Sequence, residues 1–221
     1  ILAMSSVPGF DNNNFSKFDI SNHRCKVITD QFEPGSTYKI VTAIAAMNEG
    51  NLKLYEEYNC ENGEFIYFDK KIEDHEKYGY LNLSQIMKYS SNIGIIKIAE
   101  KIGSKTLYKY SRLFGFGSKA KIDLYGETNG SLKDEKKWSK ISLGQISMGH
   151  EIGVTALQLA LAYSAIANGG YLVKPYIVDE INRKKDEFYK KTSPKVIRKI
   201  ASEEIMNNMK AMLRKVVTEG T

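Results

Sequence analysis

Hydrophobic positions along the chain predict two helices that are buried on most sides. From Ser36 to Asn48 the sequence STYKIVTAIAAMN is apolar at nearly every position after the lysine. A surface helix keeps a polar face, so a helix without one is expected at the centre of a domain. Residues 155–168, TALQLALAYSAIAN, show the same pattern and are followed by Gly169-Gly170, a common helix end.

Other segments have weaker or mixed patterns. We expect a helix from a cap at Asn82 or Ser84 through Met87, and further helices over 93–103, over 105–114 and after Ser202. We expect strands at 1–4, 27–28 and 171–181, and an irregular chain between 52 and 80. Helices dominate this order, and the strands lie towards both ends. The pattern therefore predicts an α/β chain of the α+β type, with a helical subdomain beside a sheet.

Composition excludes several classes of function. The 221 residues carry 32 basic and 26 acidic side chains, a formal net charge of +6. Basic residues mostly stand beside acidic ones, without an Arg-rich cluster interleaved with aromatics, so nucleic acid is not an expected partner. No apolar run is long enough to cross a membrane. Because the chain opens without an initiator and stops without a natural terminator, we expect a piece of a larger protein, with any anchor outside it.

Candidate chemistry lies at the start of the first apolar helix. Ser36 and Lys39, three residues apart, can touch on one helical face. Burial and the positive helix N-terminus both disfavour a charged lysine, and a neutral lysine can accept the proton of a serine nucleophile. The spacing alone is weak evidence, because Ser118 and Lys121 repeat it in a polar loop. A cap serine with a solvated lysine is the alternative for either pair.

The wider context resembles a known family. The stretches QFEPGSTYKIVTA, YLNLSQIMKYSSNIGIIKIAEKIG, IGVTALQLALAYSAIANGGYLVKPYIV and MLRKVVTEGT resemble, in order, the transpeptidase domain of class B penicillin-binding proteins. The resemblance implies one domain over residues 1–221, with an antiparallel sheet flanked by helices and a helical subdomain, as in β-lactamases. It also implies a peptidoglycan D,D-transpeptidase that binds β-lactams and needs no cofactor for catalysis.

Site residues follow from that resemblance. Ser36 matches the acylated nucleophile, and its backbone N–H would form half of the oxyanion hole. Lys39 matches the general base, Ser90 the serine that passes a proton to the leaving amine, and Asn92 the residue that binds the substrate amide. The substrates implied are peptidoglycan stem peptides, with a glycosyltransferase as partner. The expected location is the extracytoplasmic face of a bacterial membrane, anchored by a segment outside this chain.

One family motif is missing. No Lys-Ser/Thr-Gly occurs in the 221 residues. In the family this third motif lies on a strand that follows the segment resembling VVTEGT. We expect the C-terminal segment that carries it, and the strands around it, to be missing from this chain. We also expect residues 1–221 alone neither to fold stably nor to bind a β-lactam.

A second set of residues suggests a metal. His23 and Cys25 are two apart, and Asp74-His75 lie in the loop before the second motif. Zinc held by His23, Cys25 and Asp74 or His75 would be chemically sound, as a structural ion. A free buried Cys25 with an exposed His23 is one alternative, and a Cys25–Cys60 disulfide is another.

Two rival functions share these features. A class D-like β-lactamase or β-lactam sensor also uses Ser-x-x-Lys, although Asn92 departs from its usual second motif. A non-catalytic cell-wall scaffold would explain a missing third motif. Rapid hydrolysis of the acyl-enzyme would indicate the first, and the sequence downstream of residue 221 bears on the second.

Overall fold

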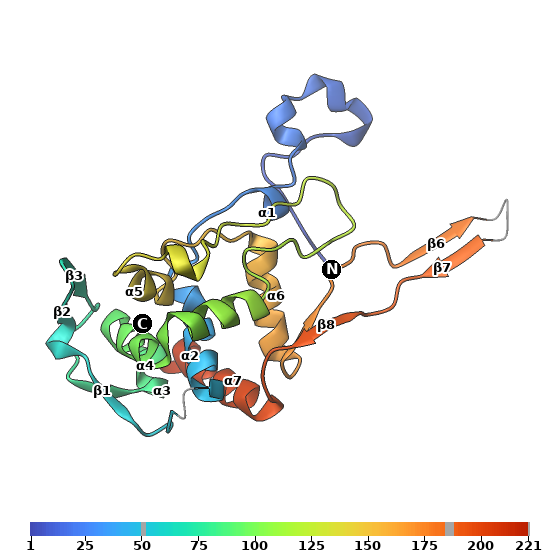
Figure 1. The fold of residues 1–221 in the computed structure, drawn as a ribbon. Coiled ribbons are helices and arrows are strands. Elements are labelled where there is room, and N and C mark those ends of the chain that lie inside the picture. Colours follow the sequence, from blue (N-terminus) through green and yellow to red (C-terminus); the bar gives the residue numbers. More distant parts are fainter. Residues whose placement is uncertain (50–51, 184–187, 221) are drawn as a thin grey trace.

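The protein, seen here in a computed structural model that describes residues 1–49, 52–183 and 188–220, is built around α2 (Figure 1). This helix, Lys39–Glu49, follows the 3-10 turn η3, Gly35–Tyr38. It packs against α4, α5 and α7, and every side chain from Lys39 to Ala46 is buried. The absence of a polar face in the sequence therefore corresponds to a helix covered by other helices.

The surrounding helices begin at capping side chains. Asn82 caps α3 and Thr155 caps α6, each through a reciprocal capping box, while Ser91 caps α4 and Ser202 caps α7. The bounds are α1 Lys26–Thr29, α3 Leu83–Lys88, α4 Asn92–Leu113, α5 Ser142–Ser147, α6 Ala156–Ala167 and α7 Glu203–Glu219, with 3-10 turns η1 Asn12–Lys17, η2 Ile20–His23, η4 Glu61–Gly63 and η5 Glu135–Lys137.

Strands in the described residues form four two-stranded antiparallel sheets. The strands are β1 Glu57–Asn59, β2 Glu64–Tyr67, β3 Lys70–Glu73, β4 Tyr80–Asn82, β5 Tyr171–Val173, β6 Glu180–Arg183, β7 Phe188–Lys191 and β8 Val196–Lys199. They pair as β1–β4, β2–β3, β5–β8 and β6–β7. The β6–β7 pair extends away from the helices as an arm (Figure 1). The chain thus combines helices with antiparallel strands, as predicted.

The main helices were predictable, and most errors concern strands. Helices expected at 36–48, 82–87, 155–168 and after Ser202 are confirmed, and Gly103, with φ +77°, breaks α4 where one helix was expected to end. The strand expected at 1–4 is wrong, and residues 27–28 lie in α1. The stretch 52–80 was expected to be irregular but contains β1, β2, β3 and the start of β4. These strands are only three or four residues long, too short to show the apolar alternation that marks a longer strand.

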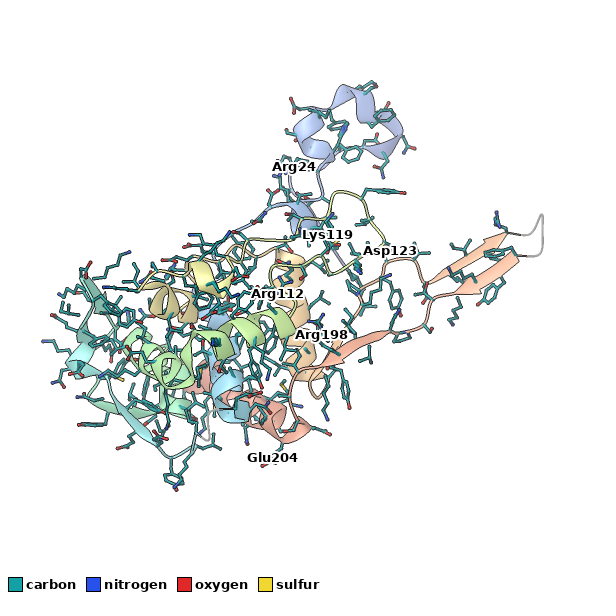
Figure 2. The ribbon with its side chains drawn as sticks, viewed as in Figure 1. Arg24, Arg112, Lys119, Asp123, Arg198 and Glu204 are labelled. Atoms are coloured by element: carbon teal, nitrogen blue, oxygen red, sulfur yellow. The ribbon has the colours of Figure 1, made fainter. Side chains whose placement is uncertain are left out.

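Arginine side chains tie the β5–β8 sheet to the helices. Arg198 on β8 donates from Nη1 to the carbonyl oxygen of Arg112 at 2.7 Å, and Arg112 donates to the carbonyls of Phe116 and Gly117 just beyond α4 (Figure 2). The two guanidinium groups thus bond carbonyls in the last turn of α4 and in the chain just after it. The β5–β8 pair is thus joined to the end of α4, on the side from which the arm projects.

Candidate active site

Ser36 lies in a turn whose shape depends on two glycines. Gly35 has φ +55°, and its N–H donates to the carbonyl of Gly149 at 3.1 Å. Gly149 has φ +88°, and a Cβ there would lie 2.2 Å from the Gly35 carbonyl oxygen. Only a residue without a side chain permits that approach. The backbone before Ser36 is therefore held by a segment more than a hundred residues away in the sequence.

Lys39 opens α2 and is almost fully enclosed. Lys39 is 1% exposed to solvent, whereas Ser36, three positions earlier, is an exposed residue. The 3-10 turn between them presents the serine hydroxyl to solvent and directs the lysine side chain inwards. The structure thus separates an accessible hydroxyl from a shielded amine, as the helical pattern predicted.

Ser90 links the two residues by hydrogen bonds. The Ser90 hydroxyl donates to Ser36 Oγ at 2.8 Å, and Lys39 Nζ donates to Ser90 Oγ at 3.0 Å. Lys39 Nζ also donates to the Ser90 carbonyl and to Asn92 Oδ1, the latter at 2.9 Å. The structure therefore brings together all four residues that the sequence singled out. Among the hydrogen bonds of the described residues, Ser36 Oγ contacts Lys39 only through Ser90.

Burial changes the acidity of Lys39. Desolvation lowers its pKa from 10.5 to about 7, and the negative charge of Asp74 acts in the opposite direction. Removing an ammonium group from water disfavours its charged form, which explains the direction of the shift. Near neutral pH a substantial fraction of Lys39 is therefore uncharged and able to accept a proton.

Asp74 organises the Ser90-Ser91-Asn92 segment, a role that sequence reasoning missed. One carboxylate oxygen accepts from the Ser91 hydroxyl at 2.6 Å, and the other accepts from the backbone N–H groups of Asn92 at 2.5 Å and Ile93 at 3.1 Å. A carboxylate at a helix N-terminus satisfies free N–H groups and interacts favourably with the helix dipole. It holds the start of α4, and with it Asn92, in place beside Lys39.

Ser90 itself has an unusual backbone. Its φ is +54°, in the left-handed region that residues other than glycine seldom occupy. The conformation is needed where the chain leaves α3 and enters α4, and it directs both the carbonyl and the hydroxyl of Ser90 to Lys39 Nζ. Strain of this kind is common at functional sites.

A pocket opens over the serine hydroxyls. It has a volume of about 310 Å³ and is lined by Ser36, His75, Tyr89, Ser90 and Asn92. The Tyr89 ring stacks on Tyr78 at 5.0 Å between centroids. Sequence reasoning named His75 only as a candidate zinc ligand and did not name Tyr89, which precedes Ser90. A ligand at Ser36 would meet one basic and one aromatic side chain beside the hydroxyls.

Segment 149–154 braces the turn from its other side. Glu33 accepts from the Glu151 N–H at 2.9 Å and pairs with His150 Nδ1 at 2.9 Å. The bond to His150 and the bond from Glu151 N–H lower the pKa of the Glu33 carboxyl. Phe32 and Val154 form a two-way backbone bridge. These contacts fix the chain that leads into Ser36. They join residues far apart in the chain, so the spacing of residues in the sequence could not predict them.

The second Ser-x-x-Lys pair has none of this surrounding structure. Ser118 uses its carbonyl to accept from Gln158, and Lys121 uses its N–H to donate to Glu127 at 2.9 Å. Lys121 is exposed and has φ +61°. No bond between the two side chains occurs among those of the described residues. The pair is a loop feature, which confirms that spacing alone carries little information.

The structure does not assemble the suggested zinc site. His23 bonds the Phe15 carbonyl and packs on the Phe10 ring, while Asp74 uses both oxygens at the start of α4. Cys25 and Cys60 are both free thiols, so the alternative disulfide is not formed. Across residues 1–49, 52–183 and 188–220, no group of three or more His, Cys, Asp or Glu side chains is placed to hold a metal. His23, Cys25 and His75 are thus individual surface or half-buried residues.

Fold and site together show the arrangement typical of penicillin-recognising proteins: an exposed serine, a buried lysine of lowered pKa, and a Ser-x-Asn segment between helices. The chain matches the family described as "Penicillin binding protein transpeptidase domain" over residues 1–221. It belongs to that family.

Sequence relatives agree with this assignment. The chain is 32% identical over 225 residues to Stage V sporulation protein D of Bacillus subtilis (strain 168), covering 100% of this chain and 35% of the relative. It is 31% identical over 187 residues to peptidoglycan D,D-transpeptidase FtsI of Escherichia coli (strain K12), covering 82% of this chain and 30% of that protein. The chain thus spans about a third of the length of the curated relatives it matches.

Solved structures share the fold. Penicillin binding protein 3 of Mycobacterium tuberculosis, complexed with aztreonam, superposes with a TM-score of 0.83 at 26% identity, over 95% of this chain and 46% of that one. The transpeptidase domain of penicillin-binding protein 3 from Burkholderia pseudomallei gives a TM-score of 0.79 at 29% identity, over 89% of this chain and 57% of that one. The predicted fold class is therefore confirmed. Within the residues that the structure describes, no helix is long and apolar enough to span a membrane.

Proposed function

We propose that the protein is a peptidoglycan D,D-transpeptidase that works through an acyl-enzyme on Ser36 and that is acylated by β-lactams at the same residue. The hydrogen-bonded series Ser36–Ser90–Lys39 carries this proposal, because it joins an exposed hydroxyl to a buried amine of lowered pKa. The names of the relatives, which include peptidoglycan D,D-transpeptidase, support the substrate class.

Acylation begins with proton removal from Ser36. The Ser36 proton passes to Ser90 Oγ as the Ser90 proton passes to neutral Lys39 Nζ, reversing the donor directions of the resting site. Ser36 Oγ then attacks the carbonyl carbon of the D-Ala-D-Ala peptide bond. The C–N bond breaks, the leaving amine takes a proton back through Ser90, and D-alanine departs. An ester on Ser36 remains.

The second step transfers the acyl group. An uncharged amine of a neighbouring stem peptide attacks the ester carbon and forms a new amide, and the proton that it loses returns to Ser36 Oγ through Ser90. Asn92 Nδ2 donates to the Glu73 carbonyl and its Oδ1 accepts from Lys39, so its amide is oriented beside the place where a substrate backbone would lie. A β-lactam follows the first step, but its opened ring keeps the leaving amine attached.

The cellular setting is part of the same proposal. The substrate lies outside the cytoplasm, which places the active enzyme on the extracytoplasmic face of the membrane, held by a segment outside residues 1–221. Substrate-carboxylate binding needs the Lys-Ser/Thr-Gly segment that these residues lack. A glycosyltransferase would supply the glycan strands that carry the stem peptides.

Labelled penicillin tests the proposal on the protein at its full natural length. We expect one equivalent of stable label on a peptide that contains Ser36, no label on Ser36→Ala, and normal labelling of Ser118→Ala, the matched Ser-x-x-Lys serine. Label that is lost within seconds would identify a β-lactamase instead. No label on the wild-type protein would indicate the non-catalytic scaffold.

A further inference from the structure

Positive charge in this chain is concentrated in one segment. Residues 174–199 contain nine Lys or Arg and four Asp or Glu, so they carry a net charge of +5 out of the +6 of the whole chain. The segment includes the β6–β7 arm and the chain that joins it to β5 and β8. The other 195 residues are close to neutral. Positive charge gathered in one segment creates a local electrostatic field that attracts anions.

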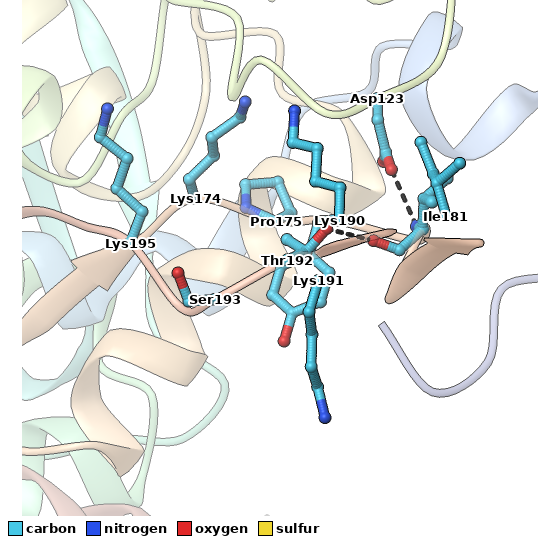
Figure 3. Close-up of a pocket in the computed structure, with 11 residues that line it drawn as sticks. Asp123, Lys174, Pro175, Ile181, Lys190, Lys191, Thr192, Ser193 and Lys195 are labelled. Atoms are coloured by element: carbon cyan, nitrogen blue, oxygen red, sulfur yellow. Dashed lines mark hydrogen bonds between the residues drawn. The ribbon is translucent and has the colours of Figure 1, made fainter. Parts of the chain in front are cut away.

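A pocket lies at the base of this arm, outside the Ser36 site. Its volume is about 440 Å³, and its charged lining consists of Asp123, Lys174, Lys190, Lys191 and Lys195. Figure 3 shows the ammonium groups of Lys174, Lys190 and Lys195 on the same side of the pocket, whereas Lys191 points away. The chain before the arm, at Lys174, and the chain after its tip, at Lys190 and Lys195, therefore contribute lysines to one concave surface.

The single carboxylate in the lining is already committed to the backbone. Asp123 accepts from the N–H of Val178 at 2.8 Å and from the N–H of Ile177 at 2.9 Å. These bonds, led by the one from Val178, lower the pKa of the Asp123 carboxyl, and Lys174 contributes through its charge. Asp123 thus shapes the pocket by holding residues 177–178, and it offsets only part of the lysine charge.

The lysines of the pocket form no direct ion pair among the residues that the structure describes, and Lys174 acts on Asp123 only through its charge. No ion pair or side-chain hydrogen bond of Lys174, Lys190 or Lys195 occurs among the interactions of the described residues. Lys174 and Lys195 are kept adjacent by a backbone bond from Lys174 N–H to the Lys195 carbonyl at 2.8 Å. Like charges held this close repel one another, and a bound anion would remove that repulsion.

We propose that this pocket binds the phosphate groups of an anionic ligand. Lysine ammonium groups are compact, strongly charged donors that suit phosphate oxygens without needing the planar geometry of arginine. The Ser193 hydroxyl also lines the pocket and adds a neutral donor. The phosphate can belong to a phosphate polymer or to a phospholipid headgroup, and the two sources differ in charge density.

The test is calorimetric titration of the full-length protein with two soluble probes, sodium tripolyphosphate and glycerophosphoglycerol, the headgroup of an anionic lipid. We expect tripolyphosphate to bind, and its affinity to fall by roughly tenfold or more in the variant Lys174→Gln/Lys190→Gln/Lys195→Gln. Binding of glycerophosphoglycerol as well would identify a headgroup as the source, and binding of tripolyphosphate alone would identify a polymer.

A matched control separates the pocket from general charge. Lys133, Lys136 and Lys137 are exposed lysines around η5, and changing all three to Gln removes the same total charge. We expect this control to bind tripolyphosphate within about twofold of wild type. Equal loss in both triple variants, equal binding of citrate, or no binding to wild type would each overturn the proposal. All substituted side chains are exposed, and circular dichroism of each variant verifies folding.

Discussion

At the scale of residues, function in this site depends on opposite environments for two neighbours. Ser36 is exposed while Lys39 is 1% exposed, and one 3-10 turn separates them. Solvent access lets a substrate reach the hydroxyl. Exclusion of water lowers the pKa of Lys39 to about 7, where the amine can act as a base. Neither property would arise from the Ser-x-x-Lys spacing alone, as the Ser118–Lys121 pair demonstrates.

The lowered pKa predicts a pH dependence. Only uncharged Lys39 can accept a proton, so the rate of acylation by labelled penicillin should rise with pH through about 7 and level off above it. Lys39→Arg should lose activity by about 100-fold or more, because arginine stays charged. Lys121→Arg serves as the control and should match wild type. A flat profile between pH 5.5 and 9 would contradict a basic role for Lys39.

The lowered pKa of Lys39 also makes the free energy of unfolding depend on pH. The folded pKa of Lys39 lies below the ordinary value of 10.5, so the unfolded chain binds more protons between pH 7 and 10.5. Within that window the contribution of Lys39 to the free energy of unfolding therefore rises with pH. Below about pH 7 the lysine is charged in both states, and its burial is at its most costly.

At the scale of elements, the Ser36 turn is shaped by segment 149–154. Gly149 approaches the Gly35 backbone too closely for any Cβ, and His150, Glu151 and Val154 bond to the residues before Ser36. These contacts connect the loop after α5 with the start of α2. The position of Ser36 is therefore determined by contact between two elements.

Gly149→Ala tests this dependence. The new Cβ would lie 2.2 Å from the Gly35 oxygen at a φ of +88°, so we expect a loss of about 2–4 kcal/mol in the free energy of unfolding and a larger fall in acylation rate. Gly103→Ala is the matched control: its φ is +77° and its ψ 163°, but nothing lies within 4 Å of the new Cβ, so we expect only backbone strain of about 1–3 kcal/mol and an unchanged acylation rate. Denaturant unfolding and penicillin labelling measure both effects. Equal acylation rates in the two variants would refute the positioning role.

At the scale of the whole molecule, the pocket over Ser36 contains two of the three sequence motifs of the family. Ser36, Ser90 and Asn92 line it, while no Lys-Ser/Thr-Gly segment exists in these residues to face them. The described strands form only two-stranded sheets. Pairs of this kind are marginally stable and leave hydrogen-bonding edges open.

Residues 1–221 alone should therefore behave differently from the longer protein. We expect uptake of labelled penicillin well below one equivalent, and a less cooperative thermal transition, because residues 1–221 hold no Lys-Ser/Thr-Gly segment and their described strands form only two-stranded sheets. Mass spectrometry and calorimetry on the 1–221 fragment and the full-length protein provide the comparison. Stoichiometric labelling of the fragment would show that a Lys-Ser/Thr-Gly segment is not required.

The sequence by itself determined the main helices, the family and the four residues of the hydrogen-bonded site. Apolar periodicity and capping residues are local signals, so α2, α3, α6 and α7 could be predicted from them. The strands between residues 57 and 82 are only three or four residues long and give no such signal, and they were missed. Tertiary structure alone decided that Ser90 lies between Ser36 and Lys39, that Asp74 bonds the backbone N–H groups at the start of α4, and that Gly149 holds the turn. These are contacts between residues far apart in the chain, and only packing brings them to hydrogen-bonding distance.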